Sequence, residues 1–196
     1  MLTPQHTHRG VTLIELSVGL AIVAIIMVSG VPSFGKWLQS SQIRTAAEAI
    51  QNGLQKTRAE AVQRNTRVKF ELTALADGGT GVDWKISCVT PIADGVADCP
   101  GTGVVPTEIQ SRSATEGTRN AVVAVAPAQT EFVFNGMGRL VPAAGIAIDI
   151  TNPTGGACAT LTDKTPPMRC MRVVVSTGGQ VRMCDPARAT PDPQAC

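Results

Sequence analysis

The sequence predicts an α+β protein, in which a long N-terminal helix with a transmembrane first half packs on an antiparallel β-sheet or sandwich head. Residues 11–31 form the longest apolar run in the 196-residue chain, and a helical apolar stripe follows it. From residue 67 onward, short alternating runs are separated by glycine and proline. We expect an N-terminal segment at 1–10, a transmembrane segment at 11–32, an amphipathic helical segment at 33–66 and a β-rich head at 67–196.

The apolar run from Val11 to Val31 can cross a hydrocarbon core of about 30 Å as a helix. It exceeds the apolar region of a secretory signal, about 7–15 residues, and no small-residue cleavage motif follows it. A simple anchor is the alternative. Glu15 argues against it, because a carboxylate in a membrane costs about 2.5 kcal/mol or more and is functional by default. A subunit that packs beside copies of itself can offset this cost.

A second helical pattern continues after Pro32. Its apolar residues recur at spacings of three, four or their multiples, which predicts one buried stripe on a helix that ends near Asn65: Ile43, Ala47, Ile50, Leu54 and Ala61. The charged residues between them are typical of a solvated helix face. This half of the helix is expected to pack on the head.

The head is predicted from short runs with strand character. They lie at residues 67–72, 84–89, 121–125, 131–134, 146–151, 171–175 and 181–184. The glycine-rich segments between them have turn chemistry, and none carries a P-loop lysine. An antiparallel sheet or sandwich follows from this pattern.

The six cysteines all follow the apolar run, and their even number favours disulfides in an oxidising compartment. They are Cys88, Cys99, Cys158, Cys170, Cys184 and Cys196. A Cys88–Cys99 bridge is the first choice, because the two are neighbours in a loop-rich segment. Cys170 and Cys184 flank the last hairpin and could pair, Cys158 could pair with either, and Cys196 could close back onto the head.

The composition argues against several function classes. The net charge of +2 is too small to indicate a nucleic-acid partner, and with 3% aromatic residues and no tyrosine the chain lacks rows of base-stacking platforms. Both histidines, His6 and His8, precede the apolar run, and no Cys-x-x-Cys pair occurs. We therefore expect no metal site, no cofactor and no enzyme activity.

The segment Arg9-Gly10-Val11-Thr12-Leu13-Ile14-Glu15 resembles the prepilin signal of type IV pilins and type II secretion pseudopilins. The resemblance implies that residues 1–10 are a leader peptide, which a membrane aspartyl peptidase removes by cleaving after Gly10 before it methylates the new N-terminus at Val11. It also implies that the transmembrane segment at 11–32 serves assembly. Glu15 stands where the family keeps a glutamate that attracts a neighbour's N-terminal amine, and Pro32 where pilins often carry a helix-bending proline. Val11 departs from the usual Phe or Met.

Three further segments are similar to the GspH/FimT branch, which includes FimU-like minor pilins: residues 43–69, 132–139 and 173–184. The resemblance implies a minor pilin or pseudopilin, held by one pass in the inner membrane with its head in the periplasm, and located at a filament tip after assembly. Its implied partners are other pilin subunits, the prepilin peptidase and the inner membrane. Pilus and secretion branches share these motifs, so the machine is left open.

The alternative function is that of a DNA-binding minor pilin for DNA uptake. DNA-binding FimT-type relatives carry Gly-Arg-x-Arg at the terminal hairpin, whereas this chain reads Gly179-Gln180-Val181-Arg182. Arginines near a hairpin can contact phosphates, and the candidates are Arg172, Arg182 and Arg188. DNA is thus a second candidate partner.

Overall fold

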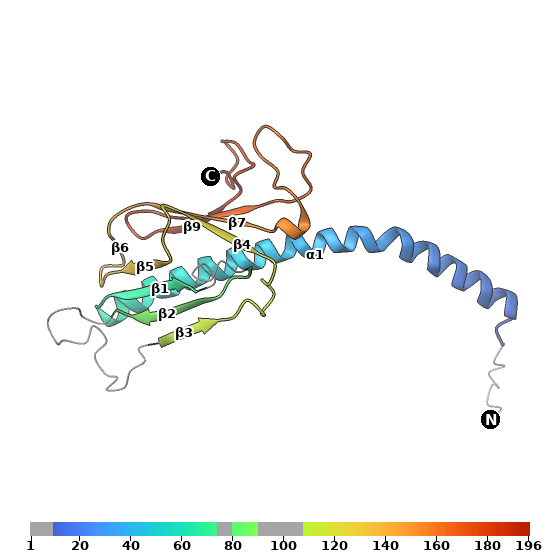
Figure 1. Cartoon of the computed structure of the whole chain (residues 1–196), viewed down its shortest axis with the longest axis horizontal. Coiled ribbons are helices and arrows are strands. Elements are labelled where there is room, and N and C mark those ends of the chain that lie inside the picture. Colours follow the sequence, from blue (N-terminus) through green and yellow to red (C-terminus); the bar gives the residue numbers. More distant parts are fainter. Residues whose placement is uncertain (1–9, 74–79, 90–107) are drawn as a thin grey trace, which may run out of the picture. The chain divides into compact units, whose positions relative to one another are not determined.

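The computed structural model describes residues 10–73, 80–89 and 108–196, apart from the side chains of residues 29–33. The chain divides into two compact units, Met1–Trp37 and Leu38–Cys196. The helix α1, Leu13–Arg64, contributes to both units (Figure 1). Its ends lie within two residues of the predicted 11–65.

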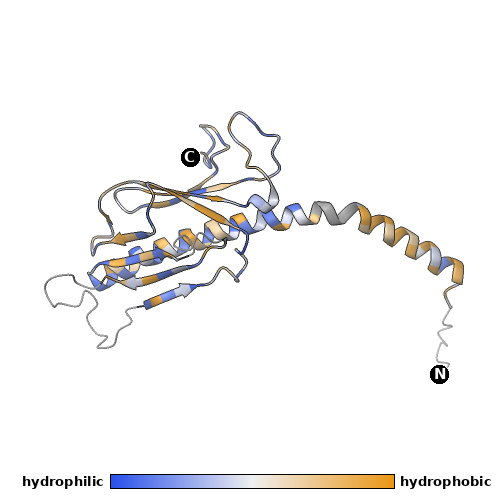
Figure 2. Cartoon of the chain, in the orientation of Figure 1, coloured by the Kyte–Doolittle hydropathy of each residue, from blue (hydrophilic) through white to orange (hydrophobic). Residues whose placement is uncertain are grey.

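The first unit consists of the N-terminal part of α1. Its helical ribbon is almost uniformly hydrophobic, whereas the second part of α1 mixes hydrophobic and hydrophilic residues (Figure 2). Over the described residues, no helix is apolar for enough consecutive positions to count as a candidate membrane span. The membrane span at 11–32 stays a prediction. So does the bend at Pro32, whose side chain lies outside the described part.

The second unit contains two antiparallel sheets. The five-stranded sheet has the order β3-β2-β1-β5-β6, and the four-stranded sheet the order β4-β7-β8-β9. The bounds are β1 Val68–Leu72, β2 Trp84–Cys88, β3 Glu108–Arg112, β4 Val122–Ala126, β5 Glu131–Phe134, β6 Leu140–Val141, β7 Ile146–Thr151, β8 Met171–Val175 and β9 Val181–Cys184, with a short 3-10 helix η1 at Pro153–Gly155.

One hydrophobic core joins the second part of α1 to both sheets. The whole predicted helical stripe is buried: Ile43, Ala47, Ile50, Leu54 and Ala61. The inward residues of both sheets complete the core, with Phe70 on β1, Ile148 on β7 and Val173 on β8 among them. In Figure 1, β7 and β9 are drawn above this part of α1, and β2 and β3 below it.

Polar contacts also tie α1 to the four-stranded sheet. The buried Asn152 follows β7 and donates from Nδ2 to Gln39 Oε1 at 2.7 Å and to the Gln39 carbonyl at 3.2 Å. Asn120 donates to the same Oε1 at 3.3 Å. Two loops are thereby fixed to one turn of α1.

All strands predicted from alternation are present, with ends within one residue. The prediction missed β3 and β6. β3 has the sequence Glu-Ile-Gln-Ser-Arg, which lacks apolar alternation, and β6 is only two residues long. The α+β architecture with two antiparallel sheets is confirmed.

Candidate functional site

A capping pair closes the N-terminal turn of α1. Thr12 precedes the helix, and its Oγ1 accepts a hydrogen bond of 3.3 Å from the Glu15 backbone N–H. Its carbonyl accepts one of 3.1 Å from the Leu16 N–H. Threonine followed three residues later by glutamate is the capping-box pattern, and it fixes where the helix starts. Glu15 therefore lies in the first turn, where the helix dipole favours a negative charge.

The predicted cleavage junction lies immediately before this turn. Residues 10–12 belong to no helix or strand, Val11 is 70% exposed, and a Cβ added at Gly10 would meet no atom within 4 Å. An exposed, non-helical peptide bond is accessible to a peptidase. The structure thus brings Gly10, Val11 and Glu15 into one short accessible segment; residues 1–9 of the predicted leader lie outside the described residues.

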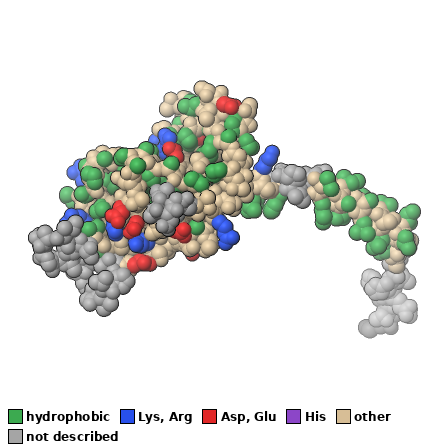
Figure 3. Space-filling model, viewed as in Figure 1, with side chains coloured by type: hydrophobic (Ala, Val, Ile, Leu, Met, Phe, Trp, Pro, Cys, Tyr) green, Lys and Arg blue, Asp and Glu red, His purple; other side chains and the backbone are tan. Residues whose placement is uncertain are grey.

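Glu15 is surrounded along the helix by exposed apolar side chains. Leu13 is 86% exposed, Leu20 64% and Val28 79%. Figure 3 shows hydrophobic side chains along the N-terminal part of α1 on the far side of the segment drawn in grey. A helix that is apolar on all sides needs an apolar environment, which a bilayer or other helices can supply. The exposed carboxylate of Glu15 lies at the N-terminal end of this surface.

The arginines predicted to contact DNA do not form one cluster of unpaired charge. Arg172 on β8 makes a bidentate pair with Asp149 on β7, with Nε–Oδ1 at 2.7 Å and Nη2–Oδ2 at 2.9 Å. This hydrogen bonding raises the pKa of the Arg172 guanidinium above its ordinary value. A phosphate would have to compete with the carboxylate already bound there.

Arg188 is similarly engaged. Its Nη1 lies 2.6 Å from Asp192 Oδ2 and its Nε lies 3.4 Å from Asp185 Oδ2. The hydrogen bond to Asp192 raises the pKa of Arg188. Arg182, the third candidate, is exposed on β9 and donates to the Cys196 carbonyl at 3.3 Å. Two of the three predicted DNA contacts are therefore already paired with carboxylates.

The disulfides correct part of the predicted pairing. Cys158 pairs with Cys170, as one of the alternatives held. Cys184 pairs with Cys196, so the pairing of Cys170 with Cys184 is wrong. The register places Cys184 opposite Arg172, which leaves Cys170 diagonal to it. Diagonal neighbours lie about 7–8 Å apart, beyond the usual Cα–Cα reach of a disulfide.

The other two cysteine expectations have different outcomes. Cys196 does close back onto the head, as one of the alternatives held. Cys88 is disulfide-bonded, but its predicted partner Cys99 lies outside the described residues. Among the described residues, no group of three or more His, Cys, Asp or Glu side chains could hold a metal ion.

Sequence reasoning missed Thr12. The Thr-x-x-Glu spacing from Thr12 to Glu15 would have been the signal for it, and the hydrogen bond between the two residues makes Thr12 part of the site. No comparable signal marks the inward-facing polar residues of β3, because that strand was itself not predicted.

Comparisons with known proteins agree with this geometry. The family described as type II transport protein GspH matches residues 46–186, well over half of the chain. The prokaryotic N-terminal methylation motif matches residues 5–31, which includes the cleavage junction and Glu15. No curated protein shows significant sequence similarity to the chain.

Solved structures resemble the chain at low sequence identity. The type IV minor pilin FimU of Pseudomonas aeruginosa gives a TM-score of 0.54 at 17% identity, covering 80% of this chain and 96% of that chain. A second crystal form of FimU gives 0.52 at 18%, covering 78% and 98%. The minor pseudopilin EpsH of the Vibrio cholerae type 2 secretion system gives 0.48 at 11%, covering 75% and 99%.

At these identities the likeness to FimU shows the fold, and the family match carries the relationship. The chain therefore belongs to the GspH family of type II transport proteins, as a subunit with the fold of minor pilins and pseudopilins.

Proposed function

We propose that the chain is a minor pilin or pseudopilin that a prepilin peptidase cleaves between Gly10 and Val11 and methylates at Val11. The first part of α1 holds the subunit in the inner membrane before assembly, with the head in the periplasm, and packs among the helices of other subunits afterwards. The observation that carries the proposal is the run of exposed apolar side chains on α1 behind an accessible Gly10–Val11 junction. The methylation motif over residues 5–31 supports the processing step.

Glu15 is the residue to which we assign assembly. Cleavage after Gly10 frees the α-amine of Val11, a cation close to the apolar surface of the helix. A carboxylate among apolar groups needs a partner, and the Val11 amine of a neighbouring subunit supplies one.

The proposed role is structural, since the GspH family consists of pilin-like subunits and not generally of enzymes. FimU is a type IV minor pilin and EpsH a type 2 secretion pseudopilin, and both machines fit the proposal. The DNA-binding alternative has less support, because Arg172 and Arg188 are paired with carboxylates.

Two measurements test the proposal. Intact mass measurement of the protein from its native membrane should give a chain that starts at Val11 and carries one added methyl group. A chain that retains residues 1–10 beside an active prepilin peptidase would contradict the processing step.

Glu15→Ala tests the assembly step. Membrane insertion and head folding should be unchanged, while co-purification with the filament or its other minor subunits should fall about tenfold or more, the equivalent of about 1.4 kcal/mol. The matched control is Glu48→Ala, which removes another glutamate of α1, one that pairs only with Arg44 at the surface. Equal incorporation of Glu15→Ala and the parent would favour the simple-anchor interpretation.

A further inference from the structure

An open pocket of about 300 Å³ lies in the head between α1 and the strands β2 and β3. Its floor follows from the strand register, which places Arg112 opposite Trp84 and Gln110 opposite Ile86. Trp84 and Ile86 are buried core residues, so Gln110 and Arg112 share the sheet face that is directed toward α1. β3 thus carries polar side chains where the neighbouring strands carry apolar ones.

The α1 side of the pocket is shaped by Gly53. A Cβ at this position would lie 2.5 Å from the Phe70 ring, so only glycine allows the ring to sit this close to the helix. Phe70 in turn packs on Trp84, with ring centroids 5.4 Å apart. The indole is therefore held in place by packing, and Trp84 lines the pocket.

Three polar atoms of the pocket are buried without a hydrogen-bond partner among the described residues. They are Trp84 Nε1, Gln110 Oε1 and Arg112 Nε. The Trp84 side chain is deeply enclosed, since the residue is only 4% exposed. Leaving such a group unpaired costs about 1–3 kcal/mol. Arg112 Nε has the Glu116 carboxylate beside it, so this cost falls on Trp84 Nε1 and Gln110 Oε1, and two such atoms at one place indicate a recognition site.

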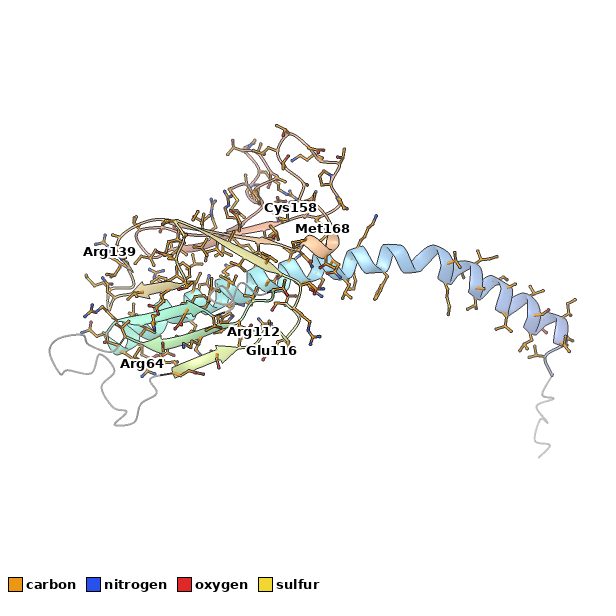
Figure 4. The ribbon with its side chains drawn as sticks, in the orientation of Figure 1. Arg64, Arg112, Glu116, Arg139, Cys158 and Met168 are labelled. Atoms are coloured by element: carbon orange, nitrogen blue, oxygen red, sulfur yellow. A yellow bond between two sulfur atoms is a disulfide. The ribbon has the colours of Figure 1, made fainter. Side chains whose placement is uncertain are left out.

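The charge of the pocket defines what it can bind. Arg112 Nη2 donates to the Glu116 carbonyl at 3.0 Å, and Arg112 Nε lies 3.2 Å from Glu116 Oε2 without hydrogen-bond geometry. Figure 4 shows Arg112 and Glu116 beside each other below α1. Lys56 is exposed on the helix side and makes no ion pair with any described residue. The pocket lining therefore carries two cations, one carboxylate and the indole of Trp84.

We propose that this pocket receives an aspartate or glutamate side chain from a neighbouring subunit of the filament, an inference that rests on the proposed function. The acidic group accepts from Trp84 Nε1 and from the two cations, and a backbone N–H of the same segment donates to Gln110 Oε1. The volume is at the lower limit for ligand pockets, and suits one inserted side chain.

Zero-length carbodiimide cross-linking of isolated filaments tests this pairing. The reagent activates a carboxylate, and the Lys56 amine then displaces the activating group to form an amide, while the reagent leaves as a urea that has taken up the elements of water. Mass spectrometry should find Lys56 joined to an acidic residue of another chain. Lys85 is the matched control, because it pairs with Glu71 at 3.3 Å.

Two variants make the test specific. Trp84→Phe keeps an aromatic ring beside Phe70 but removes the N–H together with part of the indole, and should lower Lys56 cross-linking about tenfold, as expected for a lost hydrogen bond to a charged group. Lys56→Ala changes an exposed residue, so the head stays folded, and it should lower co-purification with the partner subunit.

The outcomes separate the two proposals. The pocket assignment would be overturned if Lys56 were linked to other chains no more often than Lys85 is. It would also be overturned if Trp84→Phe left the Lys56 links unchanged. In either case ordered water would be the partner of Trp84 Nε1 and Gln110 Oε1. Absence of the parent chain from the filaments in the same samples would instead overturn the proposed function, and the pocket assignment with it.

Discussion

The two parts of α1 place similar apolar side chains in opposite environments. In the first unit Leu20 is 64% exposed, whereas in the second unit Leu54 is fully buried. The apolar residues of the first part surround the helix, and those of the second form one stripe that is covered by two sheets (Figure 2). The same residue type therefore serves folding in the second part, and in the first part it serves the intermolecular contact that we propose.

This difference shows why apolar content alone does not identify a core. In the second part, every apolar position of the stripe belongs to the buried core that residues of the two sheets complete. In the first part the apolar surface has no covering element among the described residues of its own unit. A helix of that kind is stabilised by what lies outside the chain.

The largest expected effect is on the stability of the head, when the same Leu→Ala substitution is made in each part of α1. Leu54→Ala should lower the free energy of unfolding of the head by about 2.7–5 kcal/mol, because it removes buried methyl groups and leaves a cavity. Leu20→Ala should change it by less than about 0.5 kcal/mol. Urea denaturation of the detergent-solubilised full chain, followed by circular dichroism, measures both values. Equal losses would mean that the first part of α1 also belongs to the folding core.

The next effect concerns the disulfides, which lie only in the second unit. Replacing Cys184 and Cys196 together by serine opens a loop with a sequence separation of 12 residues. The unfolded chain then gains conformational freedom, so the head should lose about 3 kcal/mol of stability. Urea denaturation measures this loss as well. The double variant Cys158→Ser plus Cys170→Ser is the matched comparison, because its disulfide closes a loop of the same sequence separation. Unchanged stability in both would show that the loops do not restrain the head.

The spacing of apolar residues in the sequence was sufficient to predict most of the fold. The apolar stripe of α1 and the alternation of strands such as β7 depend on side chains that point to one side, and this is visible in the sequence. β3 could not be predicted, because its inward side chains are Gln110 and Arg112 and its place in the sheet comes from pairing with β2. Its polar inner face is also what forms the pocket next to Trp84.

The candidate functional residues divide in the same way. Gly10, Val11 and Glu15 lie within six positions of one another in the sequence, so a local motif was enough to select them. The disulfide pairing depends on the register of β8 with β9, which puts Cys184 opposite Arg172, and no local pattern specifies that register. The ion pair between Arg172 and Asp149 joins adjacent strands, and could not be foreseen from charge counts.

The smallest expected effect concerns the water-facing side of the five-stranded sheet. This surface carries charged side chains, whereas the exposed surface of the first unit is apolar. Lys69 Nζ lies 2.6 Å from Glu131 Oε1 and 3.3 Å from Glu71 Oε2. Burial alone would lower the pKa of Lys69, but its hydrogen bond to Glu131 and the nearby carboxylates together raise that pKa above the ordinary 10.5.

Because the pKa of Lys69 is higher in the folded head than in the unfolded chain, the pair stabilises the head fully below the unfolded pKa. The contribution is lost as the pH rises through the folded value. Lys69→Met should therefore cost only about 0.5–1 kcal/mol from about pH 6 to about pH 9, as expected for a pair near the surface. The difference between parent and variant should shrink above pH 10.5. Urea denaturation of parent and variant at several pH values across this range measures the difference. The control is Lys56→Met, at an exposed lysine with no ion pair to a described residue, and its effect on stability should not change with pH in this way. A difference that grows above pH 10.5 would mean that the carboxylates do not hold the proton on Lys69 in the folded head.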